Sequence, residues 1–526
     1  MQSEVVIPEF RIYERGLEPL ELDEIKGKMS LAIRTDKDRF RMFTDILLEY
    51  VGGGEWKNRS DAFLSMAAKA CFLRGMYGYN QILAKGTRNL ACKAYAAAAY
   101  CRQNLDPRWL NNLSNYVNQM WQSKDFVGFA ELSGQLAAIL ADLGYYDRAR
   151  EIAVDSTDKV TEATKKDTSI RNLVQAALLN VRIMVAYVAT LGKSRDEALM
   201  RLESAEETAR VLDHELALAD ISYYRALVLV DSHEYEKSAS LVRSAMRKYE
   251  RMGYLYGVAN GRNLWGIIHM NQGELQDARD QFEELLVIQQ QLNNQVGLAR
   301  TLINVGEIDR MLGQVDQMET YNRRALEISQ EAEYMRGMTI ATLNLADVAV
   351  MKGKLDEALI LYQKTIGYSE SAGMRELHLL CLSQMSDVNF LRGELETAVV
   401  FAKQAREMSD EIGFPLYAFH AKLTELVTMW EMAHEQSDDL LEEVKQGIGP
   451  IKDWIDTDNS SPMVGVRRRV FDDRSVESDD CICYDPEKNF VCRVERKSLS
   501  KECFGNLFWM GSLCPFFRSF IERLYQ

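Results

Sequence analysis

Four glycines recur at one fixed spacing in this chain, and this strict period constrains the fold more than any other feature. They are Gly273, Gly313, Gly353 and Gly393, and they stand in short segments such as MNQGEL and MKGKLDEA. Self-similarity with a period of about 40 residues is typical of stacked supersecondary units, each of which buries its apolar face against its neighbours. We therefore expect an array of near-identical units instead of one globular core.

Further columns of residues repeat with the same period. One column stands before the turn glycine, a second stands after it, and a third lies at the start of each unit. Their members are Gly266, Gly306, Ala346 and Ser386, then Ala278, Met318, Ala358 and Ala398, then Gly257, Gly297 and Gly337. Small residues let helices approach closely, and glycine lets a chain leave one helix and reverse into the next. Each unit is therefore predicted to be a helix, a turn and a second helix.

The order of residue types within a unit resembles the tetratricopeptide repeat. After the turn glycine come an apolar residue, an alanine, an aromatic residue such as Phe282 or Tyr362, and a small residue. The period is similar to that of the longer repeats of kinesin light chains and of sensor domains in some bacterial and archaeal regulators. The resemblance covers residues 217–412, although the proline that often closes the shorter repeat is missing. It implies an all-α, right-handed superhelical solenoid of antiparallel helix pairs.

The prolines support a helical interpretation of the central part of the chain. The chain has eight prolines and none between Pro107 and Pro415, and proline is the residue that most strongly breaks a helix. Composition and pattern then suggest five segments. They are an N-terminal helical or irregular segment (1–55), degenerate helical repeats (56–216), the repeat array (217–445), a linker rich in glycine, proline, serine and charge (446–480), and a cysteine-rich module (481–526).

The charge and the apolar segments restrict the range of partners. A formal net charge of −15 argues against nucleic acid, because a phosphate backbone is bound by surplus lysine and arginine. The acidity indicates either a solvated outer face or selection for a basic partner. The apolar stretch 504–517 is too short to span a bilayer, and the first residues lack the pattern of a secretion signal. We expect a cytoplasmic protein without a membrane partner, and the oligomeric state stays open.

Five of the nine cysteines fall in the segment 481–526, which has little apolar surface to bury. A segment of this size usually needs a cross-link to fold, and a reducing compartment favours a metal over disulfides. Four thiolates, from Cys483, Cys492, Cys503 and Cys514, form a candidate tetrahedral site for zinc or an iron–sulfur cluster. Two alternatives remain open: redox-active or disulfide-forming cysteines, and an ordinary tail.

A search for catalytic motifs finds none. The six histidines are scattered, and the chain has no paired metal-ligand spacing, no phosphate-cradling loop and no nucleophile elbow. We therefore expect a protein without enzymatic activity, whose function comes from its surface.

Amide side chains mark the expected binding surface. In the resembled repeats, an asparagine just before the small residue of the first helix lines a concave groove and bonds the backbone of an extended peptide. Asn304, Asn344 and Gln384 hold this position here, and Arg300 and Arg310 flank it as candidate partners for a ligand carboxylate. The alternatives are amides that only tie neighbouring helices together and arginines that are merely solvated.

The sequence thus predicts a scaffold that binds a protein or peptide partner. The runner-up is a ligand-sensing signal-transduction or transcription regulator that works through a partner.

Overall fold

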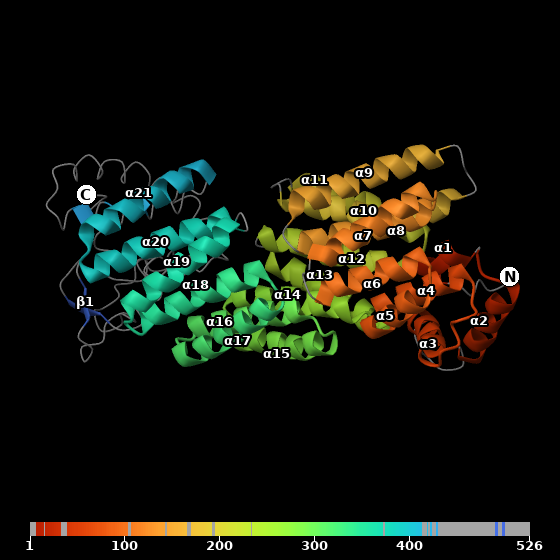
Figure 1. The fold of residues 1–526 in the computed structure, drawn as a ribbon, viewed down its shortest axis with the longest axis horizontal. Coiled ribbons are helices and arrows are strands. Elements are labelled where there is room, and N and C mark those ends of the chain that lie inside the picture. Colours follow the sequence, from red (N-terminus) through yellow and green to blue (C-terminus); the bar gives the residue numbers. More distant parts are fainter. Residues whose placement is uncertain are drawn as a thin grey trace. The chain divides into compact units, whose positions relative to one another are not determined.

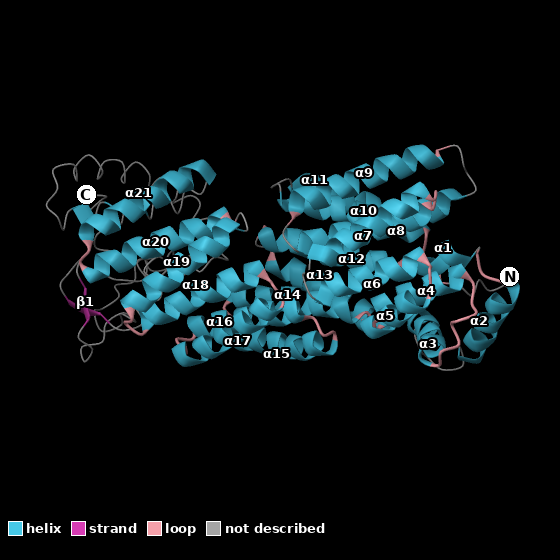
Figure 2. Ribbon diagram, in the orientation of Figure 1, coloured by secondary structure: helices cyan, strands magenta, loops and turns pink. Residues whose placement is uncertain are grey.

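The computed structural model describes nearly all of the chain up to residue 412, and almost every described segment is helical (Figures 1 and 2). The described residues are 7–14, 16–32, 39–103, 107–142, 145–165, 170–191, 195–232, 234–371, 374–412, 418, 421, 422, 425, 428, 429, 490–492 and 497–499. The chain divides into two compact units. The first comprises residues 1–270 and 274–298, and the second comprises residues 271–273 and 299–526.

The first unit holds a short 3-10 helix followed by a long series of α-helices among its described residues. They are η1 (Pro8–Phe10), α1 (Arg11–Glu14), α2 (Pro19–Ala32), α3 (Arg39–Gly52), α4 (Asp61–Leu73), α5 (Tyr77–Gly86), α6 (Leu90–Gln103), α7 (Pro107–Gln122), α8 (Phe126–Asp142), α9 (Tyr146–Thr164), α10 (Arg171–Leu191), α11 (Arg195–Val211), α12 (Glu215–Asp231), α13 (Tyr235–Met252), α14 (Leu255–Gln272) and α15 (Leu275–Gln291).

The second unit continues the helix pairs. Its described elements are α16 (Gln295–Met311), of which residues 295–298 belong to the first unit, α17 (Val315–Glu331), α18 (Met335–Met351), α19 (Leu355–Ser371), α20 (Arg375–Arg392), α21 (Leu395–Ile412), and the strands β1 (Phe490–Cys492) and β2 (Lys497–Leu499). The two strands pair in antiparallel fashion, with Cys492 opposite Lys497. The all-α class and the stacking of helix pairs are confirmed for the repeats, and the paired strands lie outside them.

Left-handed turn residues end eight of the helices from α11 to α21 and so set the length of these helices. Within the repeats the turn residues are Gly273, Gly313, Gly353 and Gly393, with φ from 71 to 83°. Between the repeats they are Asp213, Gly253, Asn293 and Glu333, with φ from 49 to 69°. Glycine adopts this backbone without strain and asparagine tolerates it. The second set of turns was not predicted from the sequence because only one of its four members is glycine.

The small-residue columns mark places where helices cross closely. A Cβ at Gly266 would lie 2.8 Å from the ring of Phe282, and a Cβ at Gly306 would lie 2.6 Å from the amide nitrogen of Asn322. Phe282, Asn322 and Tyr362 occupy the same repeat position, and all three are fully buried. The aromatic core position is therefore filled by an amide in the repeat formed by α16 and α17.

The N-terminal helices pack back onto the repeats of the first unit. Glu9 in η1 accepts a hydrogen bond from the backbone nitrogen of Leu216 at the start of α12 (3.2 Å). Gln103 at the end of α6 donates to the carbonyl of Leu292 just after α15 (3.5 Å). These contacts join residues 207 and 189 positions apart, and a linear stack of nearest neighbours would not make them. The segments interpreted as degenerate repeats and the first regular repeats thus belong to one unit.

Within the described residues, no helix combines the length and the apolar character that crossing a bilayer requires.

Candidate functional site

The predicted amide row lies on the first helices of three successive repeats in the second unit, α16, α18 and α20. Asn304 and Asn344 are both half-buried, so each keeps part of its side chain at the surface. Gln384 is only 4% exposed and is the member of the row least available to a ligand. The structure thus places two of the three amides at equivalent, partly exposed positions.

Asn344 already has one partner inside the protein. Its amide nitrogen donates to the side-chain oxygen of Asn322 on α17 (2.9 Å), and the amide of Asn322 in turn donates to the carbonyl of Met318 (2.8 Å). These two hydrogen bonds tie α18 to the preceding repeat. They agree with the alternative that the amides hold neighbouring helices together. A carboxamide has two N–H donors and one acceptor oxygen, so one internal bond leaves capacity for a ligand.

The two flanking arginines differ in their surroundings. Arg300 is half-buried in α16. Arg310, whose side chain is 10% exposed, forms a bidentate ion pair with Glu307 one turn earlier, and the Nε–Oε2 distance is 2.8 Å. Burial alone would lower the pKa of Arg310, but the carboxylates of Glu307 and Asp347 more than offset this effect and raise it. Arg310 would therefore have to exchange an internal carboxylate for that of a ligand.

A row of carboxylates runs one helical turn after the amide row. It consists of Glu307, Asp347 and Asp387, which share one position of three successive repeats. Tyr362 donates its hydroxyl to Asp347 (2.5 Å). Burial raises the pKa of Asp347 to about 7, although the Tyr362 hydroxyl and Arg310 act in the opposite direction. Sequence reasoning missed this row, although its regular spacing was a signal that could have revealed it.

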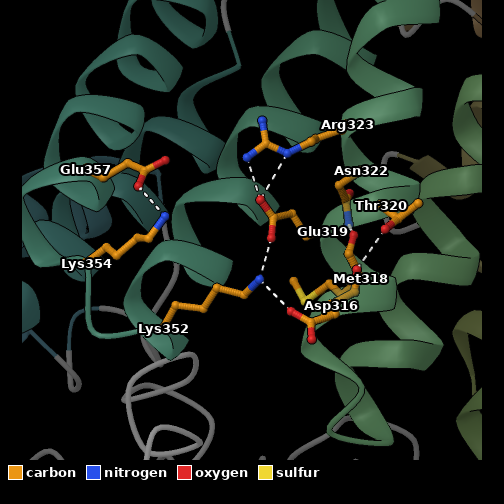
Figure 3. A network of polar contacts seen from close by, with 9 residues as sticks. All are labelled: Asp316, Met318, Glu319, Thr320, Asn322, Arg323, Lys352, Lys354 and Glu357. Atoms are coloured by element: carbon orange, nitrogen blue, oxygen red, sulfur yellow. Dashed lines mark hydrogen bonds and ion pairs between the residues drawn. The ribbon is translucent and has the colours of Figure 1, made fainter.

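A separate polar network joins α17 to α18 at the edge of the repeats (Figure 3). Lys352 contacts both Asp316 (2.6 Å) and Glu319, and Glu319 also binds Arg323 in its own helix. The same inter-repeat contact recurs one period later between Arg392 and Asp356 (2.8 Å). Asp316 is 91% exposed, and exposed ion pairs contribute little to stability. This network links neighbouring repeats at their surface and adds little to their stability.

The first unit contains a buried cluster of titratable groups. Lys69 and Glu131 form a buried ion pair, the ammonium of Lys69 also donates to the carbonyl of Glu9 (2.6 Å), and Tyr13 donates to Glu131. His214 accepts a hydrogen bond from the backbone of Ala217 (3.2 Å) and so caps α12. Burial, assisted by the charge of Lys69, lowers the pKa of His214 to about 3.

The cavity at this cluster is about 20 Å³, which is room for about one water molecule. The cluster therefore has no room for a substrate, and its bonds anchor the N-terminal segment.

The predicted thiolate site lies almost entirely outside the described residues. Cys483, Cys503 and Cys514 fall outside them, and Cys492 ends the strand β1. One other group of potential metal ligands gathers among the described residues, at His269, Glu274 and Asp277. The imidazole of His269 contacts Glu274 (2.5 Å) and stacks on the Trp265 ring. The contact with Glu274 therefore joins the end of α14 to the start of α15.

Comparisons with known proteins agree with the repeat geometry. The family model of the tetratricopeptide repeat matches residues 257–331. No curated protein matches the sequence.

Several solved structures are similar to this chain at low identity. The quorum sensor NprR from B. thuringiensis in its apo form is 16% identical, with 68% of this chain and 98% of that chain covered and a TM-score of 0.48. A signal transduction ATPase with numerous domains and a tetratricopeptide repeat sensor, from Pyrococcus horikoshii, is 13% identical, with 86% and 74% covered and a TM-score of 0.47. A Rap protein in complex with a competence and sporulation factor is 14% identical, with 69% and 100% covered and a TM-score of 0.43.

The family match falls on α14 to α17, where the left-handed turns, the small-residue crossings and the buried Phe282 and Asn322 recur with one period. Residues 257–331 are therefore similar to the tetratricopeptide repeat, and their turns recur with the longer period of about 40 residues.

Proposed function

We propose that this protein is a non-enzymatic scaffold that binds an extended segment of a partner protein or peptide along the first helices α16, α18 and α20. The observation that carries the proposal is the pair of half-buried amides, Asn304 and Asn344, at one position of two successive repeats. An extended peptide presents N–H and C=O groups at regular intervals, and carboxamides can bind both.

The absence of a catalytic role is part of the same proposal. The buried polar cluster of the first unit surrounds a cavity of about 20 Å³, and Arg310 of α16 is held in an ion pair with Glu307. Four of the described cysteines, Cys71, Cys92, Cys101 and Cys381, are buried free thiols. Free thiols support a reducing compartment such as the cytoplasm.

The test uses a displayed library of random peptides selected on the intact protein. Asn304→Ala together with Asn344→Ala should weaken the selected peptides at least tenfold, which corresponds to about 1.4 kcal/mol, and should change the melting temperature little. Gln363→Ala, an exposed amide on the second helix α19, is the matched control and should leave binding unchanged. Unchanged binding in the double variant, or a large loss of stability, would assign the amides a purely structural role.

The runner-up, a ligand-sensing regulator that works through a partner, would use the same helices for its ligand. It differs in one measurable respect, because ligand binding must then change the affinity for a second protein. A selected peptide that leaves every second interaction unchanged would favour the scaffold.

A further inference from the structure

A pocket of about 430 Å³ opens between α9, α10 and α11 in the first unit. Its apolar walls come from Val154, Val185 and Ala205, and its charged groups are Arg182, Arg201 and Asp158. Pockets of a few hundred Å³ with apolar walls and a few polar groups are typical of small-molecule sites. None of these residues belongs to the proposed peptide-binding helices.

Arg182 distinguishes this pocket from an ordinary surface hollow. It is half-buried in α10, and burial lowers its pKa. Within the part of the chain that the structure describes, no ion pair or hydrogen bond joins Arg182 to another residue. Removing a guanidinium from water without a counter-charge costs free energy.

Three other half-buried arginines of the same unit each have a carboxylate partner. Arg225 binds Glu206 (2.8 Å), Arg262 binds Glu284 (2.7 Å), and Arg74 binds Asp45 (2.6 Å). These arginines are thus neutralised by an internal acidic partner. Arg182 has no such carboxylate partner among the described residues, and it lines a pocket. The pocket leaves room for a ligand to supply the negative charge.

We propose that this pocket binds a small ligand through an oxyanion, a carboxylate or a phosphate, which pairs with the guanidinium of Arg182. The fork of N–H donors on arginine matches both groups. Val154, Val185 and Ala205 would cover an apolar part of the ligand. Asp158 is exposed and also lines the pocket. Its charge disfavours a second negative charge on the ligand, so a carboxylate fits better than a phosphate, which carries more than one charge at about pH 7.

Arg201 lies at the same pocket but differs from Arg182 in its partners. It is exposed and its guanidinium bonds to Glu197 in its own helix at 2.9 and 2.7 Å. We therefore assign the binding charge to Arg182.

The experiment titrates intact protein with isovalerate, leucine and inorganic phosphate at constant ionic strength, by calorimetry. Saturable binding of at least one probe to the natural protein, weakened at least tenfold in both Arg182→Met and Arg182→Lys, supports the proposal, and the probe that binds identifies the oxyanion. Lysine retains the charge and loses the fork, so it separates recognition of the oxyanion from simple charge attraction. No saturable binding of any probe, or equal affinity in the variants, overturns it.

Stability provides an independent readout without ligand. Arg182→Met should be at least as stable as the natural protein, because it replaces an uncompensated charge with an apolar chain. Arg225→Met is the matched control and should destabilise, since it leaves Glu206 without that partner. A loss of stability in Arg182→Met equal to that of the control would mean that Arg182 has a structural role, and would also overturn the proposal.

Discussion

At the scale of one residue, two glycines of the second unit allow the cost of a left-handed backbone to be measured without any steric clash. Gly313 has φ +71°, Gly367 lies inside α19, and a Cβ at either position would meet nothing within 4 Å. Gly313→Ala should lower the free energy of unfolding by roughly 1 kcal/mol, because a side chain disfavours the left-handed backbone. Gly367→Ala should raise it by up to about 1 kcal/mol, since alanine is the better helix former. Urea denaturation of both variants measures the difference, and equal effects would contradict the assigned turn.

Asp347 should make stability depend on pH. Its pKa is raised from 3.8 in the unfolded chain to about 7, so the folded state holds a proton between these values that the unfolded state has lost. The stability that this group contributes is therefore present below about pH 4 and is lost as the pH rises through 7. Replacing Asp347 with Asn should flatten the pH dependence of unfolding between about pH 4 and 8.

The matched control for this prediction is Asp356→Asn, an exposed aspartate in α19. It should leave the curve of the natural protein unchanged in shape. A parallel shift of the Asp347→Asn curve, with no flattening, would show that the Asp347 carboxyl titrates at the same pH in both states.

At the scale of elements, the period of the sequence determined most of what could be predicted. The column of Gly273 to Gly393 locates the turns of four repeats, and the small residues locate the crossings, because both depend on local backbone geometry. The turn at Glu333 was not predictable in the same way, because glutamate is rarely found at positive φ. The carboxylate row at Glu307, Asp347 and Asp387 was present in the spacing and was overlooked.

One residue of the predicted metal site lies in a C-terminal strand. Cys492 ends β1, and we propose that it binds zinc or an iron–sulfur cluster together with Cys483, Cys503 and Cys514. Protein purified without chelator and without a polyhistidine tag should then contain close to one equivalent of metal by elemental analysis. Cys492→Ser should abolish it, because three thiolates leave a weaker, open site. Metal-free protein prepared under anaerobic, reducing conditions would refute the site.

The control is Cys381→Ser, which changes a buried free thiol of α20. It should leave the metal content unchanged. A similar loss of metal from both variants would indicate a general effect on folding.

At the scale of the whole molecule, the contacts of the N-terminal helices could not be predicted from the repeat period of the sequence. Glu9 and Gln103 bond to residues 207 and 189 positions away, and no repeat pattern relates such partners. The segment 1–55 shows only a weak helical signal in its sequence, yet the fully buried Phe10 and Phe43 belong to the core of the first unit. Tertiary packing, not local propensity, stabilises these helices.

The two units should respond differently to a defect in the N-terminal anchor. Lys69→Met would leave Glu131 buried without its ion pair, which typically costs about 3 to 5 kcal/mol. Because Glu9 joins η1 to both Lys69 and α12, amide protection should fall in α4 and α12 together. The core of the second unit, around Ala346, Tyr362 and Leu379, is made by other helices and should keep its protection. Hydrogen exchange measures each helix separately.

The control is Lys165→Met, which removes an exposed ion pair with Glu162 and should leave the amide protection of both units unchanged. An equal loss of protection across both units in Lys69→Met would contradict the prediction, because the chain would then unfold as one cooperative body.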